Sequence, residues 1–133
     1  MDTNLAGETI IVKGAGVVYD DQGFAKRGRL MKKARLRGRW VFLASFFTRP
    51  WALRHMQLHR DKVLKYFDGD SFKGEINING CLAREIPPKD ADGNVNAFCI
   101  FDMEDNEILV LSADNENERV QWIAAINAVA CRY

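Results

Sequence analysis

The chain has 133 residues, 47% of them hydrophobic and 28% charged, which is the composition of one folded domain. This composition excludes a wholly disordered chain, and no apolar run approaches the roughly 20 residues that a membrane-spanning helix needs. The formal net charge is only +1, yet thirteen of the nineteen basic residues fall between Lys26 and Lys65, where Asp61 is the sole acid. Such a segment is expected to meet a negatively charged surface.

The first 23 residues predict a loose extension or a short added element that precedes the main fold. They contain one apolar patch at residues 10–12, which is followed by the turn-forming residues Gly14, Gly16 and Gly23. They show neither the apolar core of a secretory signal nor a Met-Gly start for myristoylation.

From Phe24 onward, short segments with alternating apolar residues and intervening turn formers predict strands. Asp68-Gly69-Asp70 is an expected turn, Asn79-Gly80 is a strong hairpin signal, and Pro87-Pro88 stops a strand. The expected strands are one that includes residues 28–32, and residues 51–58, 63–67, 73–78, 81–86, 97–103 and 107–112.

The last segment changes to helical periodicity. Asp114 or Asn115 is the expected helix cap, and Glu118, three residues after Asn115, completes a capping box. The sequence therefore predicts a mainly β domain of seven strands with one C-terminal amphipathic α-helix. The apolar positions of this helix are Val120, Ile123, Ile126 and Ala130, with Trp122 and Val129 less regularly placed.

Little in the sequence indicates catalysis. Cys81, Cys99 and Cys131 are widely spaced and odd in number, which predicts small buried thiols in a reduced, cytosolic setting. His55 and His59 have no cysteine or carboxylate cluster beside them, so we expect no bound metal. Because no nucleophile elbow, phosphate loop or paired carboxylates occur either, we expect neither enzyme activity nor a cofactor.

Several short motifs along the chain belong together. They are Gly28-x-Leu30-x-Lys32, Trp51-x-x-Arg54-x-x-x-Leu58, Leu64-x-Tyr66-Phe67, Lys73-Gly74-x-Ile76 and, most specifically, Glu118-Arg119-x-x-Trp122-Ile123. With these motifs the chain resembles a pleckstrin-homology (PH) domain from about residue 24 to residue 131. The resemblance implies a seven-stranded, strongly bent β-barrel capped by an amphipathic helix, in which Trp122 plugs one open end. Residues 1–23 are then an N-terminal extension and residues 24–133 the PH domain, with a long connection at 33–50.

Phosphoinositide-binding members of this family carry a Lys on the first strand and a Lys/Arg-x-Arg motif on the second. Lys32 matches the first position and Arg54 the last, whereas Ala52 stands at the middle basic position. Tyr66 and Lys73 match further pocket positions. The missing charge argues against tight recognition of an inositol polyphosphate, while the remaining groups suffice to hold one phosphate.

The connection at 33–50 joins a basic stretch to an apolar one, which predicts a loop that meets an anionic membrane. Basic residues near such a surface and inserted aromatic side chains both favour binding. The alternative is that the aromatic side chains fold back over the barrel. The residues expected to contact lipid phosphates are Lys33, Arg35, Arg37 and Arg39, and those expected to insert are Trp40, Phe42, Phe46 and Phe47.

A basic, aromatic first loop also resembles that of the acylated PH proteins of apicomplexan parasites. That family senses phosphatidic acid on secretory organelles called micronemes and so licenses their regulated secretion, a form of exocytosis. The resemblance implies a cytoplasmic protein, peripheral on a membrane or organelle surface. It also implies phosphatidic acid as the ligand, which needs no sugar-shaped pocket and therefore fits Ala52. The family's acylation signal lies before its domain and is absent from this chain.

Three other partners compete with phosphatidic acid. A phosphoinositide remains the alternative lipid. A protein partner could dock on Phe46-Phe47, which would make the domain a scaffold. Nucleic acid is the electrostatic competitor, but the four consecutive apolar residues at 40–43 suit acyl chains better than bases, so we expect no nucleic-acid partner.

Overall fold

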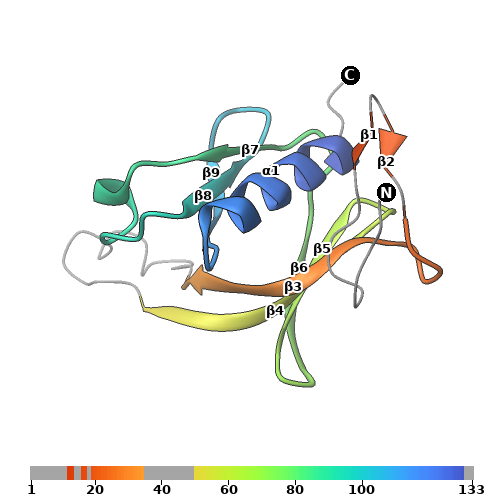
Figure 1. Cartoon of the computed structure of the whole chain (residues 1–133), viewed down its shortest axis with the longest axis horizontal. Helices are drawn as coiled ribbons and strands as arrows, with labels where there is room; N and C mark the ends of the chain where they lie inside the picture. The colour runs from red at the N-terminus through yellow and green to blue at the C-terminus, as the bar shows by residue number, and fades with distance from the viewer. Residues whose placement is uncertain (1–11, 14–15, 18, 35–49, 131–133) are drawn as a thin grey trace.

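The computed structural model describes residues 12–13, 16–17, 19–34 and 50–130 of the chain (Figure 1). Two short strands, β1 (Val12–Lys13) and β2 (Gly16–Val17), pair with each other ahead of the main sheet. The main strands are β3 (Phe24–Lys33), β4 (Trp51–His59), β5 (Val63–Asp68), β6 (Ser71–Asn77), β7 (Leu82–Glu85), β8 (Ala97–Phe101) and β9 (Glu107–Ser112). A short 3-10 helix (Pro88–Asp90) follows β7, and α1 (Glu116–Ala130) comes last.

Within the described residues, the seven main strands form one antiparallel sheet in the order β6-β5-β4-β3-β9-β8-β7. Strand β3 pairs with β4 along almost its whole length, but it pairs with β9 only through Met31 and Lys32, opposite Ser112 and Leu111. The two halves of the sheet diverge from this narrow junction, and α1 packs beside β7 (Figure 1). The predicted fold class, a strongly bent mainly β sheet with one C-terminal helix, is confirmed.

Alternation along the strands separates the core from the surface. On β4 and β5 the buried residues Met56, Leu58, Leu64 and Tyr66 alternate with more exposed neighbours. These side chains belong to one hydrophobic cluster with Trp122 of α1. Trp122 is fully buried, so it has the core position that the family resemblance implies.

Asn115 caps helix α1 as predicted, because its Oδ1 accepts a 2.8 Å hydrogen bond from the backbone N–H of Glu118, whose carboxylate lies 3.3 Å from Nζ of Lys26. The helical periodicity predicts Val120 on the buried stripe, but Val120 is 54% exposed. The buried face follows helical spacing from Trp122, which leaves position 120 on the opposite side. Neither this helix nor any other in the described part of the chain is long and apolar enough to span a membrane. The buried helix residues are Trp122, Ala125, Ile126, Val129 and Ala130.

The predicted hairpin at Asn79-Gly80 is wrong, although the turn itself forms. The backbone N–H of Cys81 donates to the carbonyl of Ile78 at 2.9 Å, and Gly80 has a positive φ of 77°. However, β6 and β7 lie at opposite edges of the sheet. The buried residues Ile78 and Cys81 flank the turn, and Gly80 N–H donates to the carbonyl of Ala130 at 3.3 Å. Contacts with the core and the end of α1 therefore hold this turn in place of strand pairing.

The cysteines are buried where the structure describes them. Cys81 is 6% exposed and Cys99 is 1% exposed, and both are free thiols. Cys131 lies outside the described residues. For the two described cysteines, the predicted burial is confirmed.

Candidate anion-binding site

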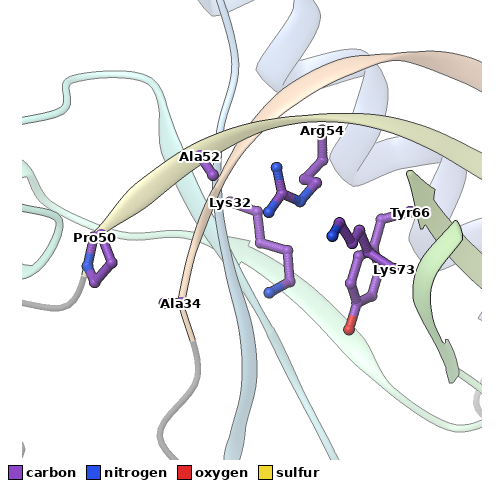
Figure 2. A pocket seen from close by; sticks show the side chains of 7 residues that line it. All are labelled: Lys32, Ala34, Pro50, Ala52, Arg54, Tyr66 and Lys73. Carbon is purple, nitrogen blue, oxygen red and sulfur yellow. The ribbon is translucent and has the colours of Figure 1, made fainter. Parts of the chain in front are cut away.

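A pocket of about 350 Å³ lies where β3 ends and β4 begins (Figure 2). Strands β3, β4, β5 and β6 each contribute one polar side chain, and these four point toward one another in Figure 2. Small or apolar residues line the opposite side. The polar residues are Lys32, Arg54, Tyr66 and Lys73, and the others are Ala34, Pro50 and Ala52.

Strand register explains why the side chains from β3 and β4 converge. Lys32 lies opposite Ala52, and the next pair on the same face of the sheet is Leu30 opposite Arg54. Leu30 is 1% exposed, so this face is the inner one. Lys32 and Arg54 are therefore diagonal neighbours at the rim of the core, which brings two cations from different strands into one pocket.

Tyr66 enters the pocket because Gly74 leaves room for its ring. The two residues lie opposite each other on β5 and β6. A Cβ atom at position 74 would lie 2.5 Å from Oη and 2.7 Å from Cζ of Tyr66. Nζ of Lys32 lies 4.7 Å from the Tyr66 ring centroid, within the range of a cation–π contact. Gly74 and Lys32 together thus determine where the Tyr66 hydroxyl sits.

The charges of the pocket favour an anion. Lys32, Arg54 and Lys73 are basic, and none of the seven described residues that line the pocket is acidic. The Arg54 guanidinium uses Nη1 to donate a 2.9 Å hydrogen bond to the carbonyl of Leu53, which helps to orient the group. Three neighbouring cations repel one another, so a phosphate placed among them would relieve this repulsion and accept charge-assisted hydrogen bonds.

Four of the predicted head-group residues, Lys32, Arg54, Tyr66 and Lys73, therefore come together in one pocket. Lys33 does not join them. It lies opposite Trp51 on the outer face of the β3–β4 pair, where its Nζ lies 3.0 Å from Oδ2 of Asp92. Alternation along β3 accounts for this difference between Lys32 and Lys33, because adjacent residues of a strand point to opposite faces.

The remaining predicted contact residues lie outside the described part of the chain, which has a gap at 35–49. The head-group and insertion roles assigned to them therefore stay predictions from the sequence. These residues are Arg35, Arg37, Arg39, Trp40, Phe42, Phe46 and Phe47.

Several residues of the site were not predicted. Ala34 and Pro50 form the apolar end of the pocket, and the backbone N–H of Ala34 donates to the Pro50 carbonyl at 2.8 Å. This hydrogen bond joins the two ends of the connection between β3 and β4, and we call this pair, Ala34 and Pro50, the neck of the connection. Asp92 was also missed, because its contact with Lys33 joins residues far apart in sequence. A Pro directly before Trp51 is the only local signal that could have indicated the neck.

Both histidines lie on strand β4. The His59 ring packs edge-on against Phe24 with centroids 5.1 Å apart, and its Nδ1 lies 3.1 Å from Oδ1 of Asp61. His55 is exposed on β4. Among the described residues, no three His, Cys, Asp or Glu side chains gather closely enough to hold a metal ion.

Solved structures share this fold. The C-terminal PH domain of human pleckstrin is 23% identical, with 86% of this chain and 97% of that chain covered and a TM-score of 0.63. The same domain of pleckstrin in complex with D-myo-Ins(1,2,3,5,6)P5 is 24% identical, with 80% and 95% covered and a TM-score of 0.62. The PH domain of human oxysterol binding protein-related protein 11 is 18% identical, with 78% of each chain covered and a TM-score of 0.55.

No curated protein sequence matches the chain significantly. The narrower resemblance to apicomplexan acylated PH proteins therefore stays a prediction. A family model described as "PH domain" matches residues 22–130. These residues include every described strand of the main sheet, α1 and the pocket. The chain thus belongs to the PH domain family, whose members are typically binding modules without catalytic activity.

Proposed function

We propose that this domain is a peripheral membrane-binding module that holds the phosphate of an anionic phospholipid in its pocket, with phosphatidic acid as the preferred ligand. The observation that carries the proposal is the division of the pocket into two unlike sides. Lys32, Arg54 and Lys73 supply three positive charges on one side, and the described residues of the opposite side are Ala34, Pro50 and Ala52 (Figure 2). One phosphate group has partners here, whereas a second phosphate on the apolar side would find none among the pocket residues that the structure describes.

Phosphatidic acid suits this arrangement because its head group is a single phosphomonoester. Lys and Arg donors stabilise the doubly ionised form of such a group, and Arg can bind two of its oxygens at once. The Tyr66 hydroxyl adds a further hydrogen-bond donor. The apolar side, including Ala52, can then contact the glycerol and ester part of the lipid, which carries no charge.

The predicted basic and aromatic segment at 35–49 would add a second contact with the membrane. Its Arg residues favour an anionic surface and its aromatic residues favour the acyl boundary. This part of the proposal rests on the sequence alone, as does a role in recruitment during regulated secretion. Without the segment, one phosphate held by three cations at an exposed site gives weak and reversible binding.

A phosphoinositide is the second candidate ligand. The observation in its favour is that a pleckstrin PH domain of the same fold has been solved with an inositol pentakisphosphate. The four polar residues of the pocket suit one phosphate of such a head group as well. The two candidates differ in what the Ala52 side of the pocket must accommodate, and binding measurements can therefore separate them.

Sedimentation with vesicles tests the proposal. Vesicles of matched net charge contain phosphatidic acid, phosphatidylserine or phosphatidylinositol 4,5-bisphosphate in neutral lipid. We expect the strongest binding to phosphatidic acid. Stronger binding to the bisphosphate would favour the second candidate, and no binding to any of the three vesicles would overturn the proposal and favour a protein partner.

A matched pair of variants locates the binding to the pocket. Arg54→Gln should weaken binding to phosphatidic acid vesicles by about tenfold or more, since hydrogen bonds to charged groups are lost. Arg60→Gln removes the same charge from the exposed turn after β4 and should change binding far less. Equal losses in the two variants would show that only the overall charge matters.

A further inference from the structure

We infer that Asp92 restrains the affinity of this domain for anionic membranes by neutralising Lys33 beside the pocket. The inference rests on the proposed function and concerns the regulation of the same site. Asp92 lies outside the pocket, in the loop between β7 and β8.

One carboxylate oxygen of Asp92 serves two partners. Its Oδ2 lies 3.0 Å from Nζ of Lys33 and accepts a 2.8 Å hydrogen bond from the indole Nε1 of Trp51. Lys33 and Trp51 lie opposite each other at the ends of β3 and β4, and Nζ of Lys33 also lies 5.9 Å from the Trp51 ring centroid. Asp92 thus ties a distant loop to both strands at the neck of their connection.

The loop that carries Asp92 is held firmly. Ala91 is fully buried, and the backbone N–H groups of Ala91 and Gly93 both donate to the carbonyl of Pro88, at 2.9 Å and 2.8 Å. Asp92 itself adopts a positive φ of 54°, which Asp tolerates better than most other non-glycine residues. Because buried Ala91 and these backbone hydrogen bonds order the loop, the Asp92 carboxylate has a defined position next to Lys33.

This contact alters the charge that the domain presents to a membrane. Lys33 follows the pocket residue Lys32 directly, and its side chain is only 13% exposed, whereas that of Asp92 is 40% exposed. An approaching lipid phosphate would meet the partly exposed carboxylate and would have to compete with it for the Lys33 ammonium. Asp92 therefore lowers the positive potential next to the pocket and weakens attraction to anionic lipid.

Asp92→Asn separates the charge of this residue from its structural contact. The amide oxygen of Asn can still accept the hydrogen bond from Trp51, while the negative charge next to Lys33 disappears. We expect Asp92→Asn to bind phosphatidic acid vesicles about fivefold more tightly than the wild type, which is the effect of about one additional basic residue near an anionic surface. Thermal denaturation of the variant checks that the domain remains folded.

Asp90→Asn is the matched control. Asp90 lies two residues earlier in the same loop and is exposed, so its replacement changes the net charge equally. We expect Asp90→Asn to strengthen binding much less than Asp92→Asn. The double variant Asp92→Asn, Lys33→Met restores the net charge of the wild type, and its binding should return close to the wild-type level.

The outcomes distinguish this inference from the proposed function. Binding by the wild type with equal effects of Asp92→Asn and Asp90→Asn would overturn the inference and leave the proposed function standing. A gain that persists in the double variant would also overturn it, because Lys33 would then not be the group released. No vesicle binding by any of the proteins would overturn both.

Discussion

The side-chain amide of Asn127 on α1 pairs with the backbone of Ala83 on β7 as a neighbouring strand would. Its Oδ1 accepts a 2.7 Å hydrogen bond from Ala83 N–H, and its Nδ2 donates a 3.1 Å hydrogen bond to the Ala83 carbonyl. Strand β7 is an edge of the sheet, and such edges offer unpaired backbone groups to other chains. Asn127 therefore occupies both backbone groups of Ala83, so a peptide adding to this edge would first have to displace the helix side chain.

Asn127→Ala is predicted to destabilise the domain by about 2 kcal/mol, because it removes two partly buried hydrogen bonds and leaves the Ala83 groups unpaired. Thermal denaturation should show a Tm about 6 °C lower than that of the wild type. Asn117→Ala, at an exposed position of the same helix, provides the control for the change in helix propensity. Similar melting temperatures for the two variants would contradict the structural role of Asn127.

Gly74→Ala should abolish most of the binding to phosphatidic acid vesicles, although position 74 carries no charge. The new Cβ atom would lie 2.5 Å from Oη of Tyr66, so the ring must move and its contact with Lys32 is lost. Overpacking of this kind costs about 1–3 kcal/mol of stability.

Tyr66→Phe separates the two contributions of this tyrosine, since it keeps the ring and removes the hydroxyl. Vesicle sedimentation should show a modest loss of binding for Tyr66→Phe and a much larger loss for Gly74→Ala. If Gly74→Ala binds like the wild type while remaining folded, the position of the Tyr66 ring does not matter for the site.

Ala52→Arg is predicted to change lipid preference. Position 52 lies opposite Lys32 and lines the apolar side of the pocket, so an Arg there would supply the charge that this side lacks. Affinity for phosphatidylinositol 4,5-bisphosphate vesicles should rise by about tenfold, since a second phosphate would gain a charge-assisted partner. Affinity for phosphatidic acid should change little. A parallel rise for both lipids would show that the residue at position 52 affects only the overall charge and does not select the head group.

Much of the fold could be predicted from local patterns in the sequence. Strand β9 occupies the predicted residues, and Asn115 caps α1 by accepting a hydrogen bond from the backbone N–H of Glu118. Both features depend on residues close together in the chain. The polar side of the pocket was also predictable, because Lys32 and Arg54 belong to a motif that family resemblance had already located on adjacent strands.

Features that depend on distant contacts could not be predicted. The Asn79-Gly80 turn was evident, but whether its flanking strands pair is decided by core contacts elsewhere. Lys33 and Lys32 look alike in the sequence, and only strand register and Asp92 separate their surroundings. The room that Gly74 leaves for Tyr66 likewise becomes visible only when the two strands are aligned.

A buried lysine provides the last prediction. Lys26 is 1% exposed, its Nζ lies 5.0 Å from the Trp122 ring centroid, and Oε1 of Glu118 lies 3.3 Å from the same atom. Oε1 of Gln121 also lies 3.5 Å from Nζ of Lys26, so Glu118 is one of several partners. Weakening the pairing of a buried charge destabilises a protein more than replacing the charge itself by an apolar group. Glu118→Gln should therefore lower the free energy of unfolding by about 1–2 kcal/mol, a value reduced because Glu118 is partly exposed.

Lys26→Met, by contrast, should stay within about 1 kcal/mol of the wild type, because an apolar side chain of similar length fits the apolar surroundings of Trp122. Glu116→Gln is the control for Glu118→Gln, since both residues lie in the first turn of α1, and the Glu116 carboxylate makes only an exposed contact of 3.8 Å with Arg119. Denaturant unfolding gives all three free energies. If Lys26→Met loses more free energy of unfolding than Glu118→Gln does, the interactions of the ammonium group stabilise the domain by more than its burial costs.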